Sequence, residues 1–375
     1  MEINWFSTRE MHDLCATTCV ALAQGLVSNS HDLTIISPDL PGSHQTRPWK
    51  HISVLNETKI PGRKTKNIAK NILKIINTLP FDSDIAIVDW TLASTLASAL
   101  QRKKQPLILM DRSPPADVGI LGRLQWPGWK RAWHLVRDGV FHSGCVVSLM
   151  HAEFVHRKCG VPLNCIHILS AGVDTTLFNI DKQRNTSSDV LNFIYHGQLD
   201  KHRGILAMPI FIQKLRQAGR SSALTFVGEG NAFNQLEEMA KGTPWLTVRH
   251  SISQKDMPSL LQKQHVGLLP MPEQGVWPLA SPLKRSEYLA SGLLVLGIDH
   301  TGHQLKGVDR SWFHLLRQDS FHEDGIIWAL SLDDKALKAG RLAGRSYAEE
   351  FLQWDSSVSA LEHAIEHAVN SQRSN

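Results

Sequence analysis

The chain has few cysteines, and their arrangement does not support a disulfide framework. Its 375 residues include five cysteines, an odd number, and none are paired in the CxxC spacing of a zinc knuckle. Such a set fits a reducing compartment. No apolar run approaches the roughly 20 residues of a membrane span, and MEINWFSTRE at the N-terminus has no basic segment followed by an apolar core. We therefore expect a cytoplasmic protein without a signal peptide.

Acidic residues are scarce relative to basic ones in the first half of the chain. Residues 1–180 carry 19 Lys and Arg against 14 Asp and Glu, whereas residues 181–375 carry 21 of each. The formal net charge of +5 thus lies in the N-terminal half. This asymmetry favours an anionic partner for that half, with surplus surface lysine for solubility as the alternative.

Short β-rich runs alternate with helical segments along the chain, a pattern typical of parallel sheets flanked by helices. The strands expected from this pattern are EINWF, LTIISP, IAIVDW, PLILMD, GCVVSL and IHILSAG in the first half, and LNFIYHG, ALTFVGEG, LTVRHSI, VGLLPMP and LLVLGI in the second. Ser7 and Glu10 have the spacing of a capping box, which predicts a first helix running through Leu26. The length favours two α/β domains.

A polar stretch, DKQRNTSSD, has the composition of a linker between the two blocks. We therefore expect an N-terminal domain over 1–180, a linker over 181–190 and a C-terminal domain over 191–345. The segment 346–375 is expected to be a C-terminal helix.

Ligands of open α/β sheets bind beyond the carboxyl ends of the strands. In the second half these ends carry Gly197 and Gly228, which let a ligand approach the backbone. Arg203 and Lys284 supply positive charge that suits a phosphate. A plain Gly-Glu-Gly turn at 228–230 is the alternative interpretation.

The stretch SPLKRSEYLASG predicts a helix start with an anion site. Ser281 is expected as the hydroxyl N-cap and Pro282 as the first helical residue, followed by Leu283. Free N–H groups at such a start bind phosphates. Glu287, further along the helix, can accept hydrogen bonds from ribose hydroxyls, although an acid there is also an ordinary solvated residue.

The order of these segments resembles a known family. FIYHGQLDKHRGI, LTFVGEG, VRHSISQKDMPSLLQKQHVGLLP, SPLKRSEYLASGLLVLGID and the earlier SAGVDTTLFN together resemble the retaining glycosyltransferases of the GT-B fold, the glycosyltransferase-4 group. The resemblance is specific over roughly 165–300 and looser over 1–164. It implies an α/β GT-B fold, with two Rossmann-like domains facing across a cleft and a C-terminal helix that crosses back to the N-terminal domain.

The resemblance also implies roles for individual residues. The two cations of the family's diphosphate clamp fall on Gln198 and Arg203, so the first is absent, and Lys284 is the candidate to compensate for it. The acid that holds the nucleotide ribose falls on Glu287. Its partner acid falls on Leu279, as in a subgroup with Ser/Asn-Pro-x-Lys-x-x-Glu-Tyr.

Two further contacts with the donor are implied. The backbone around Ser251 and Ile252 is expected to hold the base of the nucleotide. Glu273, in the loop before the helix start, is a candidate for reaching the donor sugar, with a solvent-exposed loop acid as the alternative.

The implied activity is transfer of a hexose from a nucleotide-diphospho-sugar with retention. No cofactor and no metal ion are expected, because no Asp-x-Asp motif sits at a strand end; DSD at 82–84 precedes its strand. A same-fold epimerase or phosphorylase and a non-catalytic sugar-nucleotide-binding protein are the alternatives. Nucleic acid is not an expected partner, because the strands lack aromatic stacking platforms.

The N-terminal half is expected to hold the acceptor, either a glycan or a lipid-linked acceptor. Asp111, after a strand, can orient the acceptor or cap the Pro-Pro turn that follows. Lys66, Lys70 and Lys74 share one face of a helix over 63–79, which suits either a solvated surface or anionic lipid. Trp126, Trp129 and Trp133 lie among basic residues, a composition typical of a membrane interface or of a core. A peripheral position on an anionic membrane is therefore a second hypothesis for location.

Overall fold

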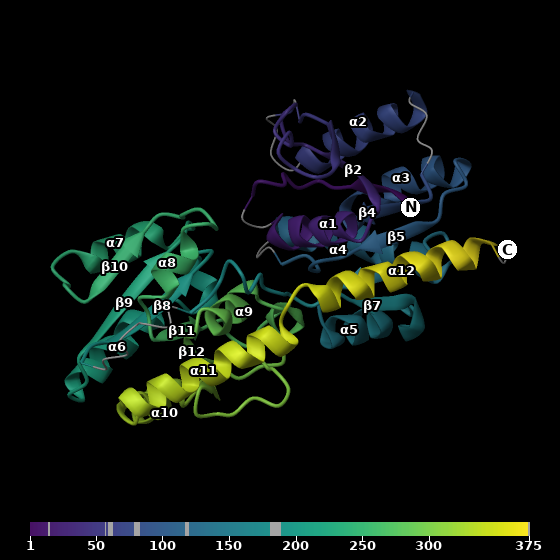
Figure 1. Cartoon of the computed structure of the whole chain (residues 1–375). Coiled ribbons are helices and arrows are strands. Elements are labelled where there is room, and N and C mark those ends of the chain that lie inside the picture. The colour runs from purple at the N-terminus through teal and green to yellow at the C-terminus, as the bar shows by residue number, and fades with distance from the viewer. Residues whose placement is uncertain are drawn as a thin grey trace. The chain divides into compact units, whose positions relative to one another are not determined.

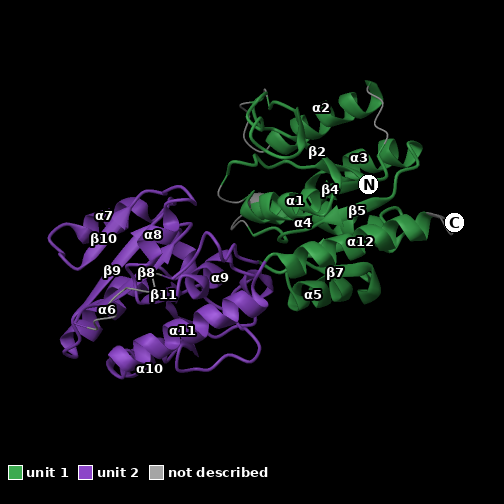
Figure 2. Cartoon of the chain, in the orientation of Figure 1, with its two compact units in different colours: residues 1–171, 354–375 green, residues 172–353 purple. Residues whose placement is uncertain are grey.

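The structure is a computed structural model that describes residues 1–13, 16–56, 58, 63–78, 83–116, 120–180 and 189–373. The chain forms two compact units, residues 1–171 with 354–375 and residues 172–353 (Figures 1 and 2). We call them unit 1 and unit 2. Each contains one parallel sheet flanked by helices, which confirms the expected α/β class.

Unit 1 contains a seven-stranded sheet in the order β3-β2-β1-β4-β5-β6-β7. Its strands are β1 (Glu2–Phe6), β2 (Asp32–Ser37), β3 (Lys50–Ser53), β4 (Ile85–Asp89), β5 (Leu107–Met110), β6 (Ser143–Val146) and β7 (Ile166–Ile168). Its helices are α1 (Thr17–Ser28), α2 (Lys64–Thr78), α3 (Trp90–Arg102), α4 (Ile120–Arg137), α5 (Leu149–Cys159) and α12 (Asp355–Arg373), with a short 3₁₀ turn, η2 (Leu163–Cys165). The short strand β3 has no counterpart among the expected strands.

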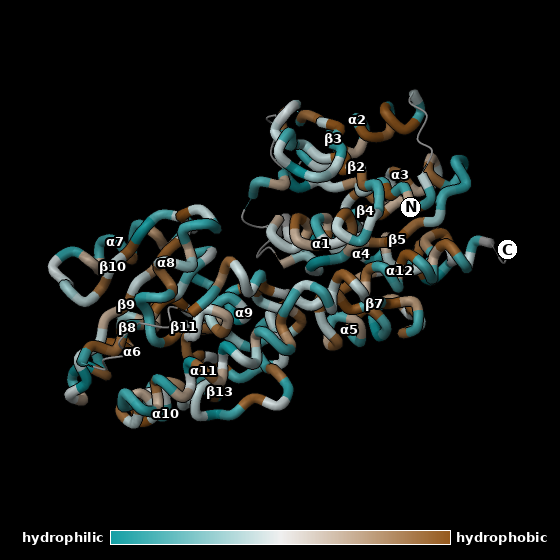
Figure 3. Tube along the Cα trace, in the orientation of Figure 1, coloured by the Kyte–Doolittle hydropathy of each residue, from teal (hydrophilic) through white to brown (hydrophobic). Residues whose placement is uncertain are grey.

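Alternate residues of each strand face opposite layers of unit 1. Trp5 and Ile87 point to one face, where they pack with residues of α1 and α12. Phe6 and Val88 point to the other, where they pack with α2, α3, α4 and α5. Hydrophobic stretches accordingly recur along the strands and on one side of the helices in Figure 3. The sheet is thus buried on both faces, as parallel sheets are.

Unit 2 contains a six-stranded sheet in the order β10-β9-β8-β11-β12-β13. Its strands are β8 (Leu191–His196), β9 (Ser222–Val227), β10 (Leu246–Arg249), β11 (Val266–Leu269), β12 (Leu294–Ile298) and β13 (Phe313–Leu316). Its helices are α6 (Ala207–Gln217), α7 (Phe233–Ala240), α8 (Met257–Leu261), α9 (Leu283–Ala290), α10 (Phe321–Leu330) and α11 (Asp334–Phe351), with 3₁₀ turns η3 (Lys201–Arg203) and η4 (Trp277–Leu279). The edge strand β13 was not expected from the sequence.

The unit boundaries differ from the expected domain boundaries. The first unit ends at Ala171 rather than at 180, because the segment 172–180 packs with unit 2, where Val173 pairs with Gln353. Of the expected linker 181–190, residues 181–188 lie outside the described part of the chain.

The C-terminal segment crosses back to unit 1, as the resemblance implied, but only from Trp354 onward. Helix α11 ends at Phe351 and belongs to unit 2, and α12 begins at Asp355. Leu361 and Ile365 of α12 are fully buried against α1 and the sheet.

The expected first helix begins later than the capping box predicted. Helix α1 starts at Thr17, and Ser7 lies in the bend after β1. The Ser7 hydroxyl donates to Asp89 across the sheet edge (2.8 Å) instead of capping a helix. Glu10 pairs with Lys64 (3.2 Å), so the sequence spacing here is not a capping box.

Candidate functional site

The loops at the carboxyl edge of the unit 2 sheet touch backbone to backbone. Gly197 follows β8 with φ +113° and Gly228 follows β9 with φ +153°. A Cβ on Gly228 would overlap the carbonyl oxygen of Gly197, and one on Gly204 would overlap that of Pro270. Glycine is therefore required here by the packing of the loops themselves, in a left-handed region that other residues rarely adopt.

Helix α9 begins one residue later than the sequence predicted. Leu283 is its first residue and Pro282 its N-cap, with no side-chain hydrogen bond at the cap. The expectation that the Ser281 hydroxyl caps this helix is thus wrong. Instead, Ser281 Oγ lies 3.4 Å from the Arg285 guanidinium, which also donates to the carbonyls of Gly302, His303 and Gln304.

Lys284 lies over the end of β8. Its Nζ donates to the Tyr195 hydroxyl (3.3 Å) and sits 4.4 Å from the centre of that ring. The same Nζ would lie 3.2 Å from a Cβ on Gly197. The structure therefore brings Lys284 and the Gly197 turn together, although they are 87 positions apart in the sequence.

Glu287 lies one turn further along α9, with 7% of its surface exposed. Its Oε2 is 3.2 Å from His196 Nε2, the last residue of β8. The angles of this contact are not those of a hydrogen bond, and within the described residues no hydrogen bond to the Glu287 side chain is formed. A buried carboxyl group with so few partners is a feature of functional sites.

Burial controls the ionisation of this pair. Burial raises the pKa of Glu287 to about 7, against the opposing effect of the Lys284 charge. Burial and then Lys284 lower the pKa of His196 to about 3, so His196 is neutral near pH 7. The site therefore holds a fixed cation, a neutral imidazole and a carboxyl group that titrates near neutrality.

Arg203 forms a separate cluster. Its guanidinium stacks on the Trp277 ring (4.7 Å), donates to Met271 Sδ (3.5 Å) and approaches Asp200 (3.9 Å). No contact joins Arg203 to Lys284 or Glu287 within the described residues. Arg203 and Lys284 are thus each held by their own contacts at the carboxyl edge of the unit 2 sheet.

The other predicted donor contacts fall into two groups. Gln198 and Glu273 are exposed, and the carbonyl oxygen of Gln198 accepts from the Tyr195 hydroxyl (3.0 Å). Ile252 packs partly against the core, and Leu279 is buried. A pocket of about 260 Å³ lies near this edge, lined by residues that include His202, Met208, Pro270, Phe321 and His322, and contains none of the predicted site residues.

Sequence reasoning missed His196, Tyr195 and Trp277. Each lies next to a predicted position in sequence or in space, but a histidine or tyrosine in a hydrophobic strand carries no signal of its own. Only the packing of α9 against β8 reveals that His196 faces Glu287.

In unit 1, the carboxyl edge of the sheet contains a second buried acid that the sequence did not suggest. Asp89, at the end of β4, accepts from the Ser7 hydroxyl (2.8 Å) and the Thr8 amide (3.2 Å). Burial raises its pKa, although Arg9, Ser7, Thr8 and Arg112 oppose the shift.

Asp111 does not face an acceptor. Its carboxylate is completely buried and accepts from the indole N–H groups of Trp129 (2.6 Å) and Trp133 (2.8 Å). It also accepts from the Ser113 amide (3.1 Å), which caps the turn at the Pro-Pro segment. Asp111 therefore has a structural role as a buried hydrogen-bond acceptor, and two of the three tryptophans of α4 are core residues.

Comparisons with known proteins extend these observations. A family model described as Glycosyltransferase Family 4 matches residues 15–177. No curated protein matches the sequence significantly.

Several solved structures match over nearly the whole chain. Sucrose-phosphate synthase from Thermosynechococcus elongatus is 14% identical, with a TM-score of 0.76 and 99% of each chain covered. HepE from Anabaena, solved with UDP-glucose, is 11% identical, with a TM-score of 0.71 and coverage of 98% and 99%. TarM from S. aureus is 10% identical, with a TM-score of 0.76 and coverage of 97% and 98%.

The solved structures show that the chain has the GT-B fold, and the glycosyltransferase family 4 model matches residues 15–177. The GT-B fold expected from the sequence is confirmed by these structures, and the resemblance to family 4 is confirmed over residues 15–177. This match lies mainly in the half where few motifs were recognised. The motifs quoted over 165–300 overlap it only at 165–177.

Among the described residues, no helix combines the length and apolar character that crossing a membrane requires.

Proposed function

We propose that this protein transfers a hexose from a nucleotide-diphospho-sugar to a glycan or lipid-linked acceptor, with retention and without a metal ion. The observation that carries the proposal is the buried carboxyl group of Glu287 on α9, beside Lys284 and the Gly197 turn. It supports donor binding because the carboxyl ends of parallel strands are where nucleotides bind in such sheets.

Each group in this site has a chemical role in the proposal. The Lys284 ammonium lies above the Gly197 turn, where it can pair with a phosphate of the departing nucleotide diphosphate. Charge stabilisation of a leaving group is a major source of catalysis when the charges are already in place. Arg203, which stacks on the Trp277 ring, supplies a second positive charge at the same edge of the sheet.

Glu287 is proposed to accept hydrogen bonds from ribose hydroxyls. A deprotonated carboxylate accepts two such bonds, and charge-assisted hydrogen bonds are stronger than neutral ones. Because the pKa of Glu287 is about 7, ribose binding requires a proton to leave this group at acid pH.

Retention is proposed from the resemblance to family 4, and metal independence from the two cations that can neutralise the diphosphate. HepE has been solved with UDP-glucose, and TarM with UDP and α-GlcNAc-glycerol. These complexes support a nucleotide-sugar donor for the present protein. The acceptor is assigned to unit 1, with a cytoplasmic location and peripheral contact with anionic membrane as part of the same proposal.

Thermal stabilisation by a panel of UDP-, GDP- and ADP-sugars tests the donor site, because a ligand that binds only the folded state raises the midpoint of unfolding. We expect one nucleotide-sugar to stabilise the wild-type protein and to lose most of this effect in Glu287→Ala and Lys284→Ala. Glu238→Ala, at an exposed acid of α7, is the matched control.

Turnover is measured next, by release of the nucleotide diphosphate in the presence of EDTA. Product anomeric configuration, read by NMR, decides retention. The proposal fails if no nucleotide-sugar binds, or if Glu287→Ala binds and turns over the donor as the wild type does.

A further inference from the structure

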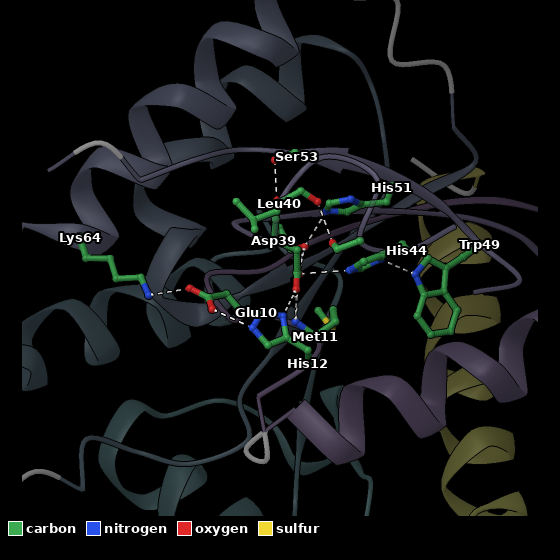
Figure 4. Close-up of polar contacts among 12 residues, drawn as sticks. Glu10, Met11, His12, Asp39, Leu40, His44, Trp49, His51, Ser53 and Lys64 are labelled. Atoms are coloured by element: carbon green, nitrogen blue, oxygen red, sulfur yellow. Dashed lines mark hydrogen bonds and ion pairs between the residues drawn. The ribbon is translucent and has the colours of Figure 1, made fainter. Parts of the chain in front are cut away.

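A polar cluster around a buried carboxylate lies at the carboxyl edge of the unit 1 sheet, beyond β2 and β3 (Figure 4). We call it the Asp39 cluster; it consists of His12, Asp39, His44, Trp49 and His51. These residues come from the loop after β1, the loop between β2 and β3, and β3 itself. None of them was singled out by the sequence motifs.

The Asp39 side chain is fully buried and accepts hydrogen bonds from several donors. The Met11 amide (2.9 Å), the Ser37 hydroxyl (2.6 Å) and His12 Nδ1 (2.9 Å) all reach its carboxylate oxygens. Burial alone would raise the pKa of Asp39, but the Ser37, Met11 and His12 hydrogen bonds and the nearby His44 outweigh burial and lower it. Asp39 is therefore an ionised carboxylate that only accepts.

The cluster has the composition of a metal site, since ligand atoms of Asp39, His44 and His51 lie within 4.8 Å of one another. Hydrogen bonding argues against a metal there. The Trp49 indole can only donate, and it donates to His44 Nδ1 (2.9 Å). His44 Nε2 must then carry the proton of the neutral ring, and it lies 3.3 Å from Asp39. A protonated nitrogen cannot bind a cation, so His44 serves as a donor to Asp39.

The exposed member of the cluster is His12, whose side chain is 66% accessible to solvent. Because Asp39 only accepts, His12 Nδ1 carries a proton and donates it to Oδ1. In the neutral ring, Nε2 then keeps its lone pair and is a hydrogen-bond acceptor. Neutral histidine in water usually protonates Nε2, so the buried carboxylate enforces the less common tautomer at a solvent-facing position.

The surroundings of His12 Nε2 suit a sugar. Glu10 lies 3.3 Å from Nε2 and pairs also with Lys64 (3.2 Å), and all three side chains are substantially exposed. The contact of Glu10 with Nε2 is an ion pair only when the ring is protonated. In the neutral ring both atoms are acceptors and do not bind each other, so a ligand hydroxyl can take the place of the exposed Glu10 carboxylate at little cost. The patch then offers an acceptor at His12, a carboxylate at Glu10 and a cation at Lys64, with the exposed side chain of Leu40 in the adjacent loop.

We propose that His12 binds a hydroxyl group of the acceptor substrate, which donates to Nε2, and that Asp39 is the positioning residue that holds the imidazole in this tautomer and orientation. The inference rests on the proposed function, because it assigns the acceptor to unit 1. It identifies the acceptor as a polyhydroxylated molecule, a glycan or the glycan part of a lipid-linked acceptor.

The test uses the full chain with ¹⁵N-labelled histidine and long-range ¹⁵N–¹H NMR spectra, which report the tautomer of each ring. The His12 signals are assigned as those that disappear in His12→Asn. The asparagine amide keeps an N–H group near the position of Nδ1, and Nε2 is removed. We expect the wild-type protein to show His12 as the Nδ1–H tautomer at pH 8. Asp39→Asn should return His12 to the usual tautomer, whereas His363→Asn, at an exposed histidine of α12, should leave it unchanged.

Methyl glycosides of common hexoses and N-acetylhexosamines are then titrated in. At least one should shift the His12 signals, and its Kd should rise roughly 5- to 10-fold in His12→Asn, the loss expected for a neutral hydrogen bond. Finding His12 as the Nε2–H tautomer, or finding no glycoside that shifts its signals, overturns the inference.

The donor experiment is independent of this result. If a nucleotide-sugar binds to unit 2 and depends on Glu287, while no glycoside reaches His12, the inference fails and the proposed function stands. If glycosides shift His12 and no nucleotide-sugar binds, the proposed transfer fails and a sugar-binding site remains.

Discussion

At the residue scale, Glu287 makes the stability of unit 2 depend on pH. A carboxyl group with a higher pKa in the folded than in the unfolded chain binds its proton more tightly when folded. Its stabilising effect is present in full below the unfolded pKa and is lost as the pH rises through the folded pKa. For Glu287 the window runs from the ordinary value of 4.5 to about 7. Ionising the buried group across this window costs roughly 3 kcal/mol, at about 1.4 kcal/mol per pKa unit.

Glu287→Gln removes this titration and therefore tests it. The variant is expected to equal the wild type in unfolding free energy at pH 4.5 and to exceed it by roughly 3 kcal/mol at pH 8. Urea unfolding at several pH values measures the difference, and comparing the two proteins cancels the titration of His196. A difference that does not change with pH would contradict the buried, ionising carboxyl group.

A second prediction at this scale concerns Asp111. Both indole N–H groups, of Trp129 and Trp133, donate to Oδ2 of Asp111, and the Ser113 amide donates to Oδ1. Asp111→Asn keeps one oxygen, so either the Ser113 amide or the two indole N–H groups lose their acceptor. Leaving a buried donor unpaired costs about 1–3 kcal/mol. We expect the unfolding free energy to fall by about that amount and the tryptophan fluorescence to change. Asp138→Asn, at an exposed acid after α4, serves as the control and should change neither.

At the element scale, the glycine turns of unit 2 hold the loops of neighbouring strands together. Gly228→Ala would bring a Cβ into the carbonyl oxygen of Gly197, so β8 and β9 must shift apart at this edge. Gly242→Ala is matched to it: Gly242 also has a positive φ (+72°), but no atom of the described part of the chain lies within 4 Å of the added Cβ.

We expect Gly242→Ala to cost about 1–2 kcal/mol, the usual penalty for a left-handed backbone, and Gly228→Ala to cost several kcal/mol more. Urea unfolding measures both. Equal losses of unfolding free energy would show that the cost of Gly228→Ala comes from the backbone conformation of Gly228 and not from the contact with Gly197.

The proposed contact with an anionic membrane depends on helix α2. Its Ile68, Ile72 and Ile76 are fully buried on the sheet, while Lys66, Lys70 and Lys74 are exposed. The burial of Trp129 and Trp133 removes two anchors that the sequence offered, so the remaining attraction is electrostatic.

Replacing Lys66, Lys70 and Lys74 with Ala should reduce binding to phosphatidylglycerol-containing vesicles by roughly 100-fold, at about 1 kcal/mol per lysine. Cosedimentation at low and at high salt measures this, because the attraction is screened by salt. The triple variant of Lys263, Lys335 and Lys338, exposed lysines of unit 2, loses the same charge and should bind as the wild type does. Equal binding of the two triple variants would refute a specific role for α2.

At the scale of the whole molecule, α12 is part of the unit 1 core although it is the last helix of the chain. Ile365→Ala removes a fully buried side chain from the layer shared by α1, α12 and the sheet, and such changes cost about 2–5 kcal/mol. Hydrogen exchange followed by mass spectrometry should show faster exchange in β1, β4 and β5 of unit 1.

Unit 2 should exchange at the wild-type rate in Ile365→Ala, because no residue of α12 belongs to its core. Glu366→Ala, at the next and exposed position of α12, is the control and should leave both units unchanged. Faster exchange in both units would mean that they unfold as one cooperative body.

The fold was largely predictable because hydrophobic strands such as IAIVD and LVLGI are buried on both faces and stand out in the sequence. The elements that the sequence did not predict lack such a hydrophobic pattern. The edge strand β3, KHIS, is only partly buried. The Ser7–Glu10 spacing matched a capping box, although Ser7 bonds to Asp89 and Glu10 pairs with Lys64. Glycine positions were predictable, whereas the reason for them, contact between loops of different strands, was not.

By itself the sequence determined the alternation of strands and helices, the two α/β units and the position of Glu287 on a helix near a strand end. These follow from local periodicity and from residues close together in the chain. Only the tertiary structure decided which polar groups meet: His196 with Glu287, Lys284 with the Gly197 turn, Asp111 with two tryptophans and Asp39 with His12. Those partners lie far apart in sequence or on different elements, and the burial that sets their ionisation exists only after the sheets and helices have packed.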